Sequence, residues 1–302
     1  MDFRWIDDLI TETGGIGCAP SRQEILAMKV SINLLAEKNN HDVMHFWGKV
    51  KGKDRNYLII IGYTGGLLGK RTAYASLDGV SWFGLPIVTK QLLFHCSHIR
   101  TPITGNPLTS STVRHPRKTE AFKDLQPLLP PKPPKEEEEE EEEQQEEKPK
   151  EEEEEEEEEE LPEYEEFSIT EDQRVSCLVH IIDKSGLIFP QDALLWKSPT
   201  EVMFNQLFNG VSPDATLEDF CRLDKTVRGE AARPGGIIDT MPQLTEDLPA
   251  RGWKVSRATN SPTTKIISLL WPGLIFISKG KHWGTCYIGD GKRNTDFLFA
   301  TQ

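Results

Sequence analysis

An unbroken acidic run in the middle of the chain places the strongest constraint on its fold. Residues 136–160 contain 20 Glu and two Lys, and they include no aliphatic or aromatic side chain. Neighbouring carboxylates repel one another, and the run has nothing to bury that would offset the conformational entropy lost on folding. We therefore expect this segment to be disordered, or at most a solvated helix.

The same run accounts for the acidity of the whole protein. It carries a net charge of −18, whereas the complete chain of 302 residues carries −14. The rest of the chain is therefore slightly basic, at about +4, and a general affinity for basic partners would rest on the run alone. A proline-rich stretch precedes the run. We expect one disordered linker, residues 108–170, between an N-terminal region, residues 1–107, and a C-terminal region, residues 171–302.

The remaining composition predicts a soluble protein of a reducing compartment. Isolated cysteines of odd number indicate free thiols that behave as small apolar side chains. The first residues lack the basic flank and apolar run of a signal peptide. No apolar stretch reaches the roughly 18–20 residues of a membrane span, so we expect no membrane association. The cysteines are Cys18, Cys96, Cys177, Cys221 and Cys286.

The N-terminal region is predicted to hold a helix followed by β-hairpins. Ser21 and Glu24 have the spacing of a capping box, and apolar residues then recur on one helical face. Asp78-Gly79 lies between two strand-like runs and is the strongest short hairpin signal. Strands are predicted at 46–50, 57–61, 72–77 and 80–85, and a short helix at 88–98.

The C-terminal region is predicted to be rich in strands. Ser212-Pro213 fits the start of a helix, with a capping serine and a proline in the first turn. The whole pattern favours an α+β fold, a mostly antiparallel sheet with a few short helices, interrupted by the disordered acidic insert. We expect the two regions to pack together as one fold. Strands are predicted at 175–182, 187–189, 265–270, 274–278 and 282–288.

The sequence holds no convincing motif for catalysis or cofactor binding. Residues 65–71 partly resemble a phosphate-binding loop. That motif requires glycine where this chain has Thr64, and Ser or Thr where it has Arg71. His95-Cys96-Ser97-His98 lacks the second ligand pair that a zinc site needs. There is no nucleophile elbow and no concentrated basic stripe for nucleic acid. We predict no enzyme activity, cofactor, metal, nucleic acid or small-molecule substrate.

The most distinctive feature of the apolar segments is that tryptophan lies near glycine in several of them. Of the seven tryptophans, three lie near glycine in apolar, strand-like runs: Phe46-Trp47-Gly48, Trp271-Pro272-Gly273 and Trp283-Gly284. Tryptophan combines a large buried area with one polar N–H, so it serves protein cores and interfaces alike. We expect packing at strand ends and turns, and interface anchoring is the alternative.

These segments resemble the family of radial spoke head protein 9. Residues 268–276 and 283–296 are similar to the end of that family, which closes on Ser-Leu-Leu-Trp-Pro-Gly-Leu and a strand ending Gly-x-Gly-x-x-Asn. Residues 46–62 and 81–86 are similar to it as well, although the linker is longer and more acidic here. The motif residues expected to pack or to form an interface are Phe46, Trp47, Gly48, Trp82, Trp271, Pro272, Gly273, Trp283, Gly289 and Gly291.

The resemblance implies a structural subunit without a cofactor. It implies a cytoplasmic, cytoskeletal protein of the ciliary or flagellar axoneme, with a fold shared with spoke head proteins four and six. Expected partners are these two proteins, other head and stalk subunits and, indirectly, the central-pair projections. The implied function is to relay mechanical signals from the central pair to the dynein arms. The alternative is a chaperone or adaptor whose acidic tract binds basic proteins, since electrostatic capture needs no fold.

Overall fold

The computed structural model describes most of the chain outside the acidic run. The described residues are 1–2, 5–16, 18–66, 69–116, 164–198, 201–212, 214–222, 243–247, 251–257 and 263–296. The glutamate run, predicted to be disordered, lies outside them. The chain divides into two units, one formed by residues 1–111 and 169–302 and the other by residues 112–168.

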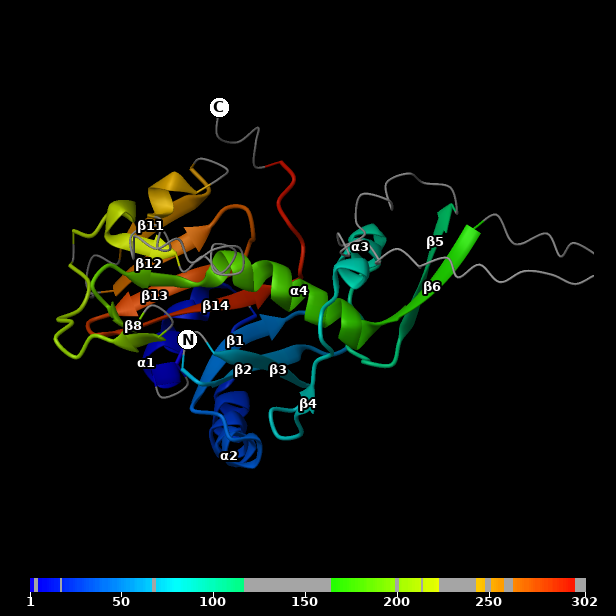
Figure 1. Cartoon of the computed structure of the whole chain (residues 1–302), viewed down its shortest axis with the longest axis horizontal. Helices are drawn as coiled ribbons and strands as arrows, with labels where there is room; N and C mark the ends of the chain where they lie inside the picture. Colours follow the sequence, from blue (N-terminus) through cyan, green and yellow to red (C-terminus); the bar gives the residue numbers. More distant parts are fainter. Residues whose placement is uncertain are drawn as a thin grey trace, which may run out of the picture. The chain divides into compact units, whose positions relative to one another are not determined.

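One eight-stranded sheet organises the larger unit (Figure 1). Its strand order is β11-β12-β13-β14-β1-β2-β3-β4, and all neighbouring strands run antiparallel except β1 and β14, which are parallel. The predicted α+β class with a mostly antiparallel sheet is thus confirmed. The strands are β1 (Val43–Val50), β2 (Tyr57–Thr64), β3 (Lys70–Ser76), β4 (Phe83–Gly84), β11 (Trp253–Arg257), β12 (Thr263–Ser268), β13 (Leu274–Lys279) and β14 (His282–Gly289).

Helices cover both faces of this sheet, so its central strands are apolar on both sides. Helices α1 (Ile6–Ile10) and α2 (Arg22–Asn39) pack on the face that includes Phe46 and Ile60. Helix α4 (Glu171–Gly186) packs on the opposite face with Trp47 and Ile59 (Figure 1). The alternation along β1 and β2 therefore divides the core into two layers.

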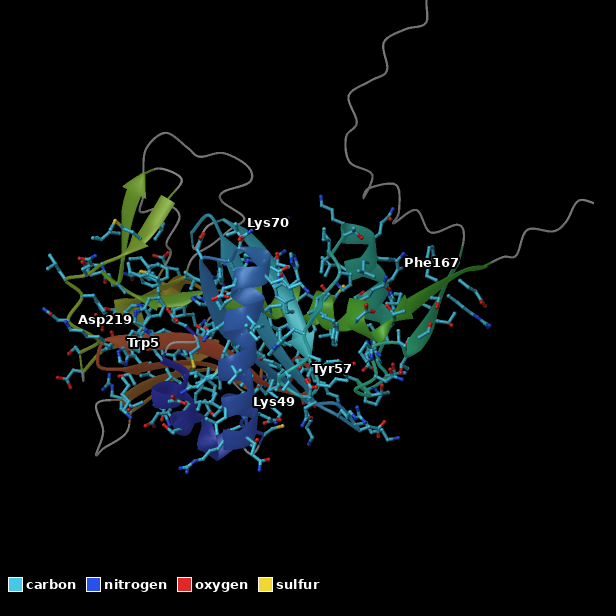
Figure 2. All side chains as sticks on the ribbon, turned by 90° about the horizontal axis from the view of Figure 1, so that it is seen from below. Trp5, Lys49, Tyr57, Lys70, Phe167 and Asp219 are labelled. Atoms are coloured by element: carbon cyan, nitrogen blue, oxygen red, sulfur yellow. The ribbon has the colours of Figure 1, made fainter. Side chains whose placement is uncertain are left out.

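The start of α2 follows the sequence prediction. The Ser21 hydroxyl accepts a hydrogen bond from the Glu24 amide, and the Glu24 carboxylate accepts one from the Ser21 amide. The ammonium group of Lys49, on β1, lies 2.9 Å from both Glu24 oxygens, beside the N-terminal end of α2 (Figure 2). Burial disfavours the charged Glu24, but the bonds from Lys49 and Ser21 outweigh it and hold the pKa of Glu24 below its ordinary value.

Two sequence predictions for the C-terminal region are wrong. The strand predicted at 175–182 is part of α4, because Val175, Val179 and Ile182 have helical spacing and Thr170 forms a capping box with Gln173. The helix predicted from Ser212-Pro213 is replaced by a single 3₁₀ turn, η4 (Leu217–Asp219), and the strand β10 (Phe220–Arg222).

That replacement has a packing reason. The β10 strand pairs with β7 (Ile188–Pro190), and the Phe220 ring makes an edge contact with Phe276 of the large sheet, at 5.3 Å between centroids. The apolar residues after Ser212 therefore serve a strand instead of a helix face. Shorter elements complete the unit: η2 (Thr11–Ile16), α3 (Lys90–His98), β8 (Leu194–Ser198), β9 (Glu201–Phe204) and η6 (Leu244–Glu246).

The smaller unit contains strands at both ends of the range predicted as a linker. Strands β5 (Ser110–Pro116) and β6 (Tyr164–Thr170) form a two-stranded sheet. The Arg114 guanidinium pairs with the Glu166 carboxylate at 2.6 Å. Within residues 108–170, which the sequence predicts as one disordered linker, residues 110–116 and 164–170 are thus strands.

A buried carboxylate fixes the start of α4 within the larger unit. Glu171 is 1% exposed, and its oxygens accept hydrogen bonds from the Tyr57 hydroxyl, the Thr104 amide and hydroxyl, and the Gly105 amide, all at 2.7 Å. Burial opposes ionisation, but these donors outweigh it and keep the pKa of Glu171 below its ordinary value. The carboxylate thus joins α4, β2 and the loop before β5.

We expect Glu171→Gln to lower the free energy of unfolding by about 2–3 kcal/mol at neutral pH, because an amide cannot accept from all four donors. Since the pKa of Glu171 is lowered in the folded state, its contribution is complete above the ordinary carboxylate pKa and is lost as the pH falls through the folded value. Urea unfolding of both proteins over a pH series measures this. A constant gap between wild type and variant down to strongly acidic pH would contradict it.

Candidate functional site

The described residues hold no group of three or more His, Cys, Asp or Glu side chains placed to bind a metal ion. Among the helices described, none is both long and apolar enough to cross a membrane. The features that stand out are a close backbone junction, a cleft and an exposed apolar helix face, all in the larger unit.

The junction is the parallel pairing of β1 with β14, which joins the N-terminal and C-terminal halves of the sheet. The pairing starts where Gly48 meets Tyr287, just after an irregularity in the β1–β2 register. Gly48 has φ +155°, and a Cβ atom there would lie 1.9 Å from the Tyr287 carbonyl oxygen. The two backbones can approach this closely only because residue 48 has no side chain.

The Tyr287 side chain anchors the same junction. It is fully buried, and its ring lies 5.4 Å from the Trp47 ring. The Gly291 amide donates to the Tyr287 hydroxyl at 2.8 Å, and a Cβ on Gly289 would lie 2.6 Å from that hydroxyl. Burial, with a smaller effect of the Asp290 charge, raises the pKa of Tyr287 to about 12. The phenol is therefore neutral, and its hydroxyl oxygen serves as a fixed acceptor for the Gly291 amide.

The Trp271-Pro272-Gly273 turn closes the junction from the β12–β13 side. Trp271 is buried in the same cluster as Trp47 and Tyr287. Gly273 has φ +98°, its carbonyl accepts from the Ile288 amide at 2.9 Å, and a Cβ there would lie 2.0 Å from the Ile288 carbonyl oxygen. The turn is thus locked against the end of β14.

The structure separates the other motif residues from this junction. Phe46 is buried on the α2 face of the sheet. The Trp82 indole donates to the Ser31 hydroxyl of α2 at 2.8 Å. Trp283 stacks on Phe276 at 6.2 Å between centroids. Tyr287 is the central residue that sequence reasoning did not single out, and its place between the Trp283-Gly284 and Gly289-x-Gly291 motifs was the available signal.

A cleft of about 570 Å³ opens beside the junction. The Arg71 guanidinium pairs with the Asp183 carboxylate of α4 at the cleft and lies 5.0 Å from the centre of the Tyr63 ring. Both charges of the pair are therefore already engaged. The Trp, Tyr and Phe residues of the lining are Trp5, Trp47, Tyr63, Phe189, Phe204, Phe208, Trp283 and Tyr287.

The outward face of α2 presents an apolar stripe. Leu26, Val30 and Leu34 occur at intervals of four residues, which places them on one side of a helix. They are 64%, 70% and 65% exposed. Side chains of this kind usually lie in a core or an interface when they adjoin one another. The α2 stripe is therefore a candidate contact surface.

Comparison with known proteins identifies relatives over nearly the whole chain. The family described as radial spokehead-like protein matches residues 127–302. Proteins named radial spoke head protein 9 homolog are similar along their length. The one from Homo sapiens is 26% identical over 297 residues, and the one from Bos taurus is 25% identical over 295 residues, with 94% of both chains covered in each case. The one from Xenopus tropicalis is 23% identical and 99% of both chains is covered.

The junction predicts a large penalty for a side chain at position 48. Gly48→Ala should lower the free energy of unfolding by more than about 3 kcal/mol, because strain adds to a clash with the Tyr287 backbone. The matched control is Gly280→Ala, where φ is +60° but no atom lies within 4 Å of the new Cβ, so only about 1–2 kcal/mol should be lost. Denaturant unfolding measures both. Equal decreases in the free energy of unfolding for the two variants would show that the close approach of Gly48 to Tyr287 does not add to the cost of the substitution.

Proposed function

Because the chain belongs to the radial spokehead-like protein family, we propose that it is a subunit of the radial spoke head that helps relay mechanical signals from the central pair to the dynein arms. Family membership supports a structural role in the radial spoke and a location in the ciliary or flagellar axoneme. The observation that carries the proposal is the match to radial spoke head protein 9 homologs, which covers 94% of both chains.

The described fold suits a part that transmits displacement. The sheet is continuous across both halves of the chain, and β1 and β14 join at its middle. Gly48, Gly273 and Tyr287 hold backbone against backbone at this junction. A load applied to either half therefore reaches the other half through a packed, hydrogen-bonded sheet and not through a flexible hinge.

We assign the α2 stripe to contact with another spoke head subunit, and we name spoke head proteins four and six as the expected partners. A structural subunit of an assembly must present a surface that its partners cover. Leu26, Val30 and Leu34 offer apolar area for this purpose while the opposite side of α2 is buried in the core. The matching surface on the partner would be apolar as well.

The alternative is a chaperone or adaptor that binds basic proteins through residues 136–160. The net charge of −18 is its one support. The family match favours the spoke over this alternative.

The first test concerns location. The protein should remain with axonemes after detergent extraction and salt washing, and should co-purify with spoke head proteins four and six. Immunoblots of fractionated cilia measure both. Release of the protein with the soluble matrix, or its absence from cilia, would contradict the spoke proposal.

The second test concerns the α2 stripe. Val30→Glu should reduce binding to spoke head proteins by tenfold or more, because a buried unpaired charge costs more than about 1.4 kcal/mol. The melting temperature should hardly change, since Val30 is exposed.

The control is Leu207→Glu, the same kind of change at an apolar residue that is 84% exposed and lies outside α2. It should leave binding unchanged. Co-precipitation with purified spoke subunits and size-exclusion chromatography of the free chain measure the effects. Normal binding by Val30→Glu would remove the stripe as the partner surface, and loss of a homodimer would assign it to a second copy of this chain.

A further inference from the structure

The cleft beside the junction is lined mostly by aromatic and aliphatic side chains. Its walls come from strands β1, β2, β7 and β14, from the end of α4, and from β9 with the segment after it. The cleft volume of about 570 Å³ lies within the roughly 300–1,000 Å³ of ligand-binding clefts. The α2 stripe lies on another element, so the proposed contact with spoke head subunits does not account for this cleft.

Aromatic rings continue from the buried interior of the cleft to its exposed rim. Tyr63 is 2% exposed. The ring of Trp283 lies 6.1 Å from the ring of Phe204, which is 37% exposed. Trp5 is 36% exposed, and its ring stacks on His282 at 3.7 Å between centroids. Ring faces at successive depths offer contacts to several residues of one extended chain.

Three polar hydrogens of the lining have no acceptor in the described part of the chain. They belong to the Tyr63 hydroxyl and to the indole N–H groups of Trp47 and Trp283. Tyr63 and Trp47 are 2% and 7% exposed. By contrast, the indole of Trp82, outside the cleft, donates to Ser31. A buried tyrosine or tryptophan donor usually finds an acceptor, so these groups indicate a ligand that brings acceptors into the cleft.

The charged side chains of the lining cancel one another. Asp2 and Asp183 are balanced by Arg71 and Lys281, and Arg71 with Asp183 forms the ion pair at the cleft. Burial raises the pKa of the Tyr63 hydroxyl, which therefore stays protonated and remains a donor. The cleft thus favours an uncharged ligand over a phosphate or a carboxylate.

We propose that this cleft binds an uncharged, proline-rich segment of a partner protein in an extended conformation. Such a segment has carbonyl acceptors but no backbone N–H at each proline. It therefore brings acceptors for Tyr63, Trp47 and Trp283 without adding donors that the cleft would have to satisfy. Its polyproline II conformation exists before binding and packs well against aromatic side chains, so little conformational entropy is lost.

The test uses the purified full-length chain and a blocked nonapeptide made of Pro-Pro-Leu repeats. Isothermal titration calorimetry should show saturable binding of this peptide. The matched control peptide, made of Gly-Gly-Leu repeats, keeps the leucines and the carbonyl groups but loses the preformed conformation. It should bind about tenfold more weakly or less, because ordering it costs more conformational entropy.

Two pairs of variants test whether the peptide binds in the cleft. Tyr63→Phe removes only a hydroxyl and should weaken binding about three- to tenfold, the effect of one neutral hydrogen bond. Its control, Tyr74→Phe, removes a hydroxyl that lies 2.8 Å from His41 Nε2 outside the cleft, and it should bind like wild type. Phe204→Ala should weaken binding about fivefold or more, whereas Leu207→Ala, at an exposed residue outside the lining, should not.

Melting temperatures of the variants check that each is folded, and Tyr63→Phe decides alone if Phe204→Ala is not. The proposal is overturned if the Pro-Pro-Leu peptide does not bind, if the Gly-Gly-Leu peptide binds equally well, or if the cleft variants bind like wild type. Equal weakening by the control variants would overturn it as well. A dimer of the free chain that Phe204→Ala dissociates in size-exclusion chromatography would assign the cleft to a second copy and reject the proposal.

Discussion

The close approach of Gly48 to the Tyr287 carbonyl is the contact on which the rest of the fold depends. It lets β1 and β14 pair in parallel, and this pairing alone makes one eight-stranded sheet out of two antiparallel halves. The continuous sheet has apolar side chains on both faces, and each face must be buried against other elements. Helix α2 supplies one cover from the N-terminal half, and α4 supplies the other from the C-terminal half. The two halves therefore depend on each other for a complete core.

Several carboxylates of the larger unit accept hydrogen bonds from backbone amides and side chains. Glu171 accepts from the loop at Thr104, and Glu24 accepts from Ser21 and Lys49. The amides of Ser81 and Val80 lower the pKa of Asp78 to about 2 and so fix the turn between β3 and β4. In each case a lowered carboxylate pKa has a structural cause, unlike the raised values that general acids need. This use of charge is consistent with a scaffold.

Local signals in the sequence predicted local structure well. The capping box at Ser21 and the turn at Asp78-Gly79 rest on neighbouring residues, and both are present in the fold. The prediction of a strand at 175–182 is wrong because a short apolar stretch fits a buried strand and a buried helix alike. The capping box of Thr170 and Gln173 starts a helix just before this run, and the run continues it. The junction itself could not be predicted, since the need for glycine at position 48 comes from a carbonyl 239 positions away.

The division of the sheet between distant parts of the chain also explains why the fold tolerates a long acidic linker. The insertion lies between α3 and α4, after the four N-terminal strands and before the C-terminal ones, so it interrupts no strand of the large sheet. In the smaller unit, β5 and β6 pair with each other and bring the two ends of the insert together. With the ends held in this way, the entropy cost of added residues grows only with the logarithm of their number, at about 0.6 kcal/mol per doubling. An insertion at this place can therefore be long and acidic without disturbing the junction at Gly48, because no strand of the large sheet passes through it.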